Sequence, residues 1–175
     1  SSIMSKKLAA GSHTIVLDVK CGSGAFMKTL DDATALAEKM VDIGLACNRK
    51  VSAFITDMNR PLGDAVGNSL EVSEAIETLR GNGPDDFTEL ATEVSAKMIS
   101  MSLKKDLIES RIIASEAIKS GKAYEKMLAW ISAQGGDTRY IENTSLFNTA
   151  PVIYEIKAPC DGYIASMDSE KIGLA

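Results

Sequence analysis

Two side chains near the start of the chain have the types and the spacing to act on one ligand together. Ser2 and Lys6 lie four residues apart, in a run whose apolar pattern predicts a helix over residues 2–10 that ends at Gly11. Residues four apart share one face of a helix, so a hydroxyl and an ammonium would point the same way. Without further context, such a pair is typical of a solvated helix surface.

A glycine-rich turn carries the next group of interest. The β-branched run at residues 14–19 predicts a strand buried on both faces, and Lys20, the Gly22-Ser23-Gly24 turn and Phe26 follow it. Glycine amides can cradle a phosphate, but Met27 stands where the dinucleotide fingerprint needs a third glycine, which favours a simple tight turn. Two interpretations of Lys20 stay open: a residue that supports a site, and a cap on the end of the sheet.

The elements that position these groups begin with a strand, helix, strand unit. A helix with Asp31 and Asp32 at its N-terminal end separates the first strand from a second one at residues 50–57. Connected this way, the two strands are expected to lie in a parallel or mixed sheet. The buried stripe of this helix is expected to comprise Ala33, Leu36, Ala37, Met40, Val41 and Leu45.

A helical cluster is predicted after the second strand. Its helices cover residues 69–79, a stretch that begins at Pro84, and residues 104–120 and 122–133. The helix after Pro84 is expected to bury Phe87, Leu90, Ala91, Val94, Met98 and Met101. Residues 152–157 and 163–167 then have the composition of strands, and this change places a domain boundary near Ala158. The predicted fold class is α/β, a mixed or parallel sheet with flanking helices.

Charge and composition narrow the class of function. The formal net charge is -5, with basic residues scattered among acidic ones, which argues against a nucleic-acid partner. No apolar stretch reaches membrane-spanning length and no signal-peptide pattern opens the chain, so a cytoplasmic location is expected. The three cysteines, Cys21, Cys47 and Cys160, predict reduced thiols.

Three segments together resemble one known family. They are Ser2-Ile3-Met4-Ser5-Lys6-Lys7-Leu8-Ala9-Ala10-Gly11, Asp18-Val19-Lys20-Cys21-Gly22-Ser23-Gly24-Ala25-Phe26-Met27 and Thr56-Asp57-Met58-Asn59-Arg60-Pro61-Leu62-Gly63-Asp64-Ala65-Val66-Gly67-Asn68. Their order is similar to that of the pyrimidine-nucleoside phosphorylase and thymidine phosphorylase family. The resemblance implies a pentosyltransferase that cleaves pyrimidine (deoxy)nucleosides with phosphate, reversibly, to a free base and a pentose 1-phosphate.

The same resemblance implies site residues. Ser2 and Lys6 match the family's pyrimidine-binding pair, and Phe26 matches a position beside the base; a core phenylalanine is the other interpretation of Phe26. Lys6 is expected to be catalytic, because an ammonium stabilises the negative charge that develops on the departing base. Leu62 and Ala65 carbonyls with the Glu74 carboxylate match a potassium site, and hard cations prefer such oxygen ligands.

Domain organisation and partners also follow from the resemblance. Residues 1–11 would end a small helical domain, residues 12–157 would belong to the α/β domain, and residues 158–175 would begin a C-terminal α/β subdomain. The chain is therefore expected to be a segment of a longer homodimeric enzyme, with the phosphate-binding residues upstream of Ser1. The preference for ribose or deoxyribose, and for uracil or thymine, stays open.

Two other interpretations of the whole chain stay open. A phosphoribosyltransferase of the anthranilate type has a related fold, but it would need a magnesium-binding acidic pair that the sequence does not display. A dimerisation or scaffold fragment without catalytic activity is the other alternative.

Overall fold

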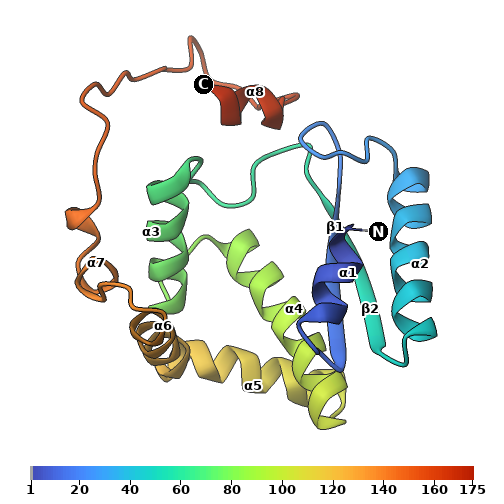
Figure 1. Cartoon of the computed structure of the whole chain (residues 1–175). Coiled ribbons are helices and arrows are strands. Elements are labelled where there is room, and N and C mark those ends of the chain that lie inside the picture. Colours follow the sequence, from blue (N-terminus) through green and yellow to red (C-terminus); the bar gives the residue numbers. More distant parts are fainter. Residues whose placement is uncertain (1) are drawn as a thin grey trace.

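The chain is described over residues 2–175 by a computed structural model, in which helices surround a two-stranded parallel sheet (Figure 1). β1 (Thr14–Cys21) and β2 (Lys50–Asp57) pair along their whole length, from Thr14 beside Lys50 to Cys21 beside Asp57. α2 (Leu30–Ala46) connects them, because parallel strands need a crossover rather than a tight turn. The predicted strand, helix, strand unit and the α/β class are confirmed.

The main core lies between β1 and α2. Alternate residues of β1, namely Ile15, Leu17 and Val19, are buried against the helix, as the period of two in a strand requires. α1 (Ser2–Ala9) closes the same core with Met4, which is 1% exposed. The helix predicted at the start of the chain is confirmed, and Gly11 follows it with a φ of 77°, the left-handed conformation of a helix stop.

The buried stripe of α2 differs from the expectation at one end. Ala33, Ala37 and Met40 are buried as expected, but Leu45 is 55% exposed and Gly44 lies at the buried face. The helical period continues from residues 37 and 40 to residue 44, which turns residue 45 outward. A side chain at position 44 would collide with Val51, so glycine allows α2 to approach β2 closely.

The helices after β2 lie to one side of the sheet (Figure 1). They are α3 (Asn68–Leu79), α4 (Asp85–Leu103), α5 (Leu107–Lys119), α6 (Lys122–Ala133), α7 (Arg139–Glu142) and the 3-10 turn Thr144–Leu146. α4 packs on α5 and on β1, so it buries more than one side. Of the six residues expected on its buried face, Met98 is 52% exposed and the other five are partly buried, whereas Ala96 is the fully buried residue of α4.

Arg80, at the end of α3, ties three helices together. Its Nη2 donates hydrogen bonds to the Tyr124 hydroxyl and to the carbonyls of Ile141 and Glu142, at 3.0, 3.1 and 2.8 Å. Nη1 donates to Oε1 of Glu77 at 2.7 Å, and the guanidinium lies 4.9 Å from the centre of the Tyr124 ring. One side chain therefore holds α6 and α7 against α3.

The strands predicted at residues 152–157 and 163–167 are wrong. Both segments lack strand pairing and are exposed, with Ile156 at 89% and Tyr163 at 103%. A strand needs a neighbour to take its hydrogen bonds, and residues 2–175 place none beside these two segments. The boundary near Ala158 stays a prediction.

α8 (Ser169–Leu174) lies near the loops that follow β1 and β2 (Figure 1). A Cβ built on Gly24 would be 2.7 Å from the Ser169 Cβ, and Glu170 Oε2 is 3.8 Å from Lys28 Nζ. The last helix thus contacts the turn that carries Phe26. Among the helices described between residues 2 and 175, none is both long enough and apolar enough to cross a membrane.

Candidate active site

The glycine turn after β1 is held by the segment that follows β2. The amide of Gly24 donates to the carbonyl of Met58 at 2.9 Å, and the amide of Ser23 donates to Asn59 Oδ1 at 3.0 Å. Gly22 has a φ of 135°, and a Cβ there would lie 2.7 Å from the Asn59 backbone nitrogen. These amides are committed within the protein, which favours the tight turn over a phosphate cradle.

The turn presents Phe26 to solvent. Its side chain is 100% exposed, which rules out the core interpretation within this chain. A pocket of about 260 Å³ opens beside it, and the lining residues come from α1, β1, the turn and α2. An aromatic ring at the rim of such a pocket can form a wall for a flat heterocycle.

α1 brings its first turn to the same pocket. Ile3 lines the pocket with Phe26, while Ser2 and Lys6 are exposed on the helix and are not among the lining residues. The buried Met4 fixes how α1 sits on α2 and β1. The structure therefore places the start of α1 beside Phe26, whereas the contacts of Ser2 and Lys6 with a base stay predictions.

A polar cluster lies at the carboxyl end of the sheet beside this pocket. Lys20 Nζ is 2.8 Å from Asp18 Oδ2, and the Thr56 hydroxyl donates to Asp18 Oδ1 at 2.5 Å. Lys20 and Thr56 are neighbours in the strand register. Asp18 and Lys20 both line the pocket. Ligand sites of α/β sheets are typically found at this end of the strands.

The loop between β2 and α3 carries the predicted potassium ligands. Glu74 Oε1 accepts hydrogen bonds from the amides of Asp64 and Ala65, at 2.8 and 2.9 Å. Gly63 has a φ of 72°, and a Cβ there would collide with Glu74 Oε2. The carboxylate therefore lies directly against the loop.

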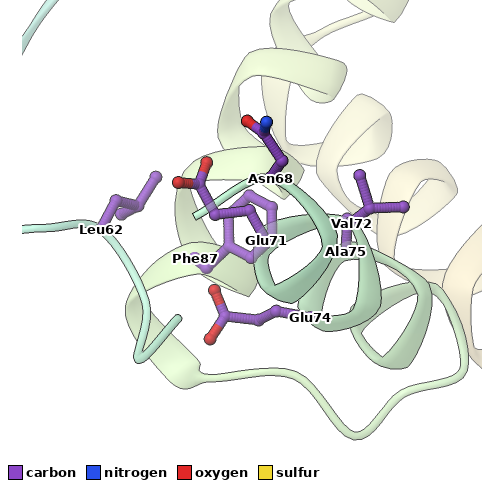
Figure 2. A pocket seen from close by; sticks show the side chains of 7 residues that line it. All are labelled: Leu62, Asn68, Glu71, Val72, Glu74, Ala75 and Phe87. Atoms are coloured by element: carbon purple, nitrogen blue, oxygen red, sulfur yellow. The ribbon is translucent and has the colours of Figure 1, made fainter. Parts of the chain in front are cut away.

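Two more carboxylates hold the same loop. Glu71 Oε1 accepts from the amide of Gly67 at 2.9 Å, and Asp86 Oδ2 accepts from the amide of Gly63 at 3.3 Å. A pocket of about 510 Å³ lies between the loop and the helices, and Figure 2 shows Glu71 and Glu74 projecting from α3 to the side on which Leu62 lies. The remaining lining residues are Asn68, Val72, Ala75 and Phe87.

The chemistry of this loop fits a monovalent cation. Among residues 2–175, no hydrogen bond reaches Glu74 Oε2 or the carbonyl oxygens of Leu62 and Ala65, so the three predicted ligand positions keep uncommitted oxygens. The described residues form no group of three or more histidine, cysteine, aspartate or glutamate side chains suited to a metal. An ion here would thus depend on backbone carbonyls with one carboxylate.

The sequence alone did not single out Asp18, Thr56, Glu71 or Asp86. Asp18 and Thr56 lie on different strands, so the strand register would have been needed to bring them together. Glu71 precedes Glu74 by three residues on one helix, a spacing that places both on one face. That spacing was a usable signal for a second acidic side chain at the loop.

The comparisons with known proteins define the class. A family described as "Glycosyl transferase family, a/b domain" matches residues 1–124, and the chain belongs to this family. The chain is also similar to pyrimidine-nucleoside phosphorylases of Staphylococcus epidermidis and Staphylococcus aureus. It is 50% identical to each of them over 176 aligned residues. The alignments cover the whole of this chain and 41% of each relative, so the chain spans about two fifths of their length.

Proposed function

We propose that this chain is a segment of a pyrimidine-nucleoside phosphorylase, an enzyme that transfers the pentose of a pyrimidine nucleoside to phosphate. The observation that carries the proposal is the fully exposed Phe26 at a pocket that α1 shares. The 50% identity to two proteins with that name supports the choice of reaction. The substrates would be a pyrimidine nucleoside and inorganic phosphate.

The base would lie in the Phe26 pocket. The phenyl ring offers an apolar wall, and Ser2 and Lys6 on α1 would face the carbonyl and imide groups of the pyrimidine. When the glycosidic bond breaks, the electron pair stays with the base. The Lys6 ammonium would stabilise that charge more than it stabilises the neutral nucleoside, which is the condition for catalysis.

A potassium ion would be held by the carbonyls of Leu62 and Ala65 and by Glu74. Bound there, it would supply one positive charge beside three carboxylates and keep the loop carbonyls turned inward. Glu74 already orients this loop through the amides of Asp64 and Ala65. We also infer a homodimer in the cytoplasm, for which the support is the family resemblance and the composition.

The test is phosphorolysis by the full-length protein that contains this chain. Purified protein is incubated with uridine, with and without phosphate, and the release of uracil is followed by chromatography. We expect uracil and ribose 1-phosphate only when phosphate is present. No uracil under any condition, or a base transfer that depends on phosphoribosyl pyrophosphate and magnesium, would contradict the proposal.

A further inference from the structure

The polar cluster of Asp18, Lys20 and Thr56 belongs neither to the proposed base site nor to the proposed cation site. It lies on the face of β1 opposite Ile15, Leu17 and Val19, and the side chains of Asp18 and Lys20 are 28% and 31% exposed. Such partial exposure leaves both groups open to a ligand. The pocket beside them is lined by residues of β1, the glycine turn, α1 and α2.

The pocket has two kinds of wall. One is apolar and consists of Ile3, Leu17, Val19, Phe26, Met27, Leu36 and Met40, together with small residues of the turn. The other is polar and consists of Asp18 and Lys20 at the end of β1. A ligand that fills the pocket would therefore need a flat apolar part and a separate part rich in hydrogen-bonding groups.

The polar wall is suited to hydroxyl groups. An ammonium has three donors, and the ion pair with Asp18 uses one of those of Lys20. A carboxylate has about four acceptor positions, and Lys20 and Thr56 use two of those of Asp18. The pair can donate to a hydroxyl and accept from a neighbouring one, which matches a pentose.

The charges of Asp18 and Lys20 disfavour the binding of phosphate at this position. Asp18 lies 2.8 Å from the ammonium, so the pair together carries no net charge. A phosphate bound to Lys20 would also meet the Asp18 carboxylate, and like charges at such a distance repel. A neutral sugar has no such penalty.

We propose that Lys20, oriented by Asp18 and Thr56, binds a hydroxyl of the substrate's pentose while the base lies against Phe26. This inference rests on the proposed function, because it takes a nucleoside as the ligand. It assigns sugar recognition to the carboxyl end of β1 and base recognition to α1 and the turn. Asp18 is a positioning residue that also offers acceptor oxygens to the sugar.

Binding measurements can separate sugar recognition from base recognition. Isothermal titration calorimetry of the full-length protein in phosphate-free buffer would compare uridine with uracil. We expect Lys20→Met to weaken uridine binding by about tenfold or more, the scale of a lost hydrogen bond to a charged group, and to leave uracil binding unchanged. Asp18→Asn keeps the shape of the side chain. It should also weaken the binding of uridine relative to that of uracil. Lys119→Met, at an exposed position at the end of α5, is the matched control.

Each outcome has a distinct meaning. Equal weakening of uridine and uracil, or no change in either, would overturn the assignment of Lys20 to the sugar. Loss of phosphate binding with unchanged uridine binding would also overturn it, in favour of an anion site. If Lys20→Met does not fold, the ratio of the uridine and uracil affinities of Asp18→Asn tests the proposal in its place. If the wild-type protein binds neither uridine nor uracil, the proposed function itself fails, and this inference falls with it.

Discussion

Lys6 is exposed and carries its charge on a short helix whose one buried residue is Met4. Removing the ammonium should therefore leave the core of Met4, Ile15 and Leu17 intact while it removes the donor that we propose for the departing base. A side chain with this combination of exposure and placement can be tested by kinetics with little interference from folding.

Lys6→Ala in the full-length protein should lower kcat/KM for uridine by about two to three orders of magnitude, the scale of one lost donor to a developing anion. Ser2→Ala should cost less, because a neutral hydrogen bond contributes less than a charge-assisted one. Lys7→Ala, the exposed neighbour on the same helix, is the control. Circular dichroism should show all three variants folded, and near-normal turnover of Lys6→Ala would exclude Lys6 from the site.

Glu74→Gln tests the cation loop. The carboxylate accepts two amides at 2.8 and 2.9 Å, so the substitution weakens two charge-assisted hydrogen bonds and should lower the free energy of unfolding by about 1 kcal/mol. If potassium binds here, the loss should be larger in potassium buffer than in a buffer with a large organic cation.

Glu71→Gln is the control for this experiment, because Glu71 also accepts an amide of the loop but is not a predicted ligand. The decrease in melting temperature that Glu71→Gln causes, relative to the wild type, should be the same in both buffers. If melting temperature and activity prove insensitive both to Glu74→Gln and to the cation, the loop is only a turn.

At the scale of the elements, the sequence could predict β1 and β2 themselves, but a strand also needs a paired neighbour, which a local pattern does not reveal. The segments at residues 14–19 and 50–57 carry enough β-branched and apolar residues to be identified as strands from their own composition, and both predictions are confirmed. Residues 152–157 have the same local character, yet they are not a strand, because pairing depends on a neighbour that no local pattern contains.

The same limit applies to the site. Phe26, Leu62 and Glu74 could be proposed from motifs, because each lies within a short recognisable segment. The link between Asp18 and Thr56 spans 38 residues and exists only once the strands pair. Contacts made by tertiary structure, such as those of Asp86 with the loop, leave no periodic trace in the chain.

Arg80→Lys should release α6 and α7 from α3. The shorter ammonium cannot reproduce the planar contact with Tyr124 or reach both the Ile141 and Glu142 carbonyls, so we expect a loss of about 1 to 3 kcal/mol in the free energy of unfolding. Chemical denaturation followed by circular dichroism measures it. Lys119→Arg, on the exposed end of α5, should leave the midpoint unchanged, and an unchanged midpoint for Arg80→Lys would mean that the helices hold together without this side chain.

Acid should weaken the contact that Arg80 makes between α3 and the helices α6 and α7. The hydrogen bond from Arg80, helped by that from Asn82, lowers the pKa of Glu77. A lowered folded-state pKa means that this stabilisation is fully present above the ordinary glutamate value of about 4.3 and is lost as the pH falls through the folded value below it. Thermal unfolding of the wild type and of Glu77→Gln between about pH 6 and pH 3 should converge at the acid end. Parallel curves would contradict this role.

At the scale of the whole molecule, the chain spans about two fifths of the length of the phosphorylases that it matches. The 175-residue chain should show no measurable phosphorolysis, because stabilising a departing base does little without a positioned nucleophile, and the phosphate-binding residues are predicted to lie outside it. Uracil release from uridine measures this, with the full-length protein as the positive control. Robust turnover by the 175-residue chain would place the phosphate site within it.

The position of the core within the chain has a consequence for biosynthesis. The buried core residues run from Met4 to Met40, and the hydrophobic residues packed against them end at Ile55. During translation, chains generally fold from the N-terminus onward as segments leave the ribosome. The core beside the Phe26 turn can thus be complete once β2 and the adjoining Met58 and Asn59 have emerged, whereas the loop at residues 62–67 must wait for α3 and α4 to supply its carboxylates. A ribosome that pauses between the two events would carry a nascent chain whose Phe26 pocket has formed and whose loop at residues 62–67 has not.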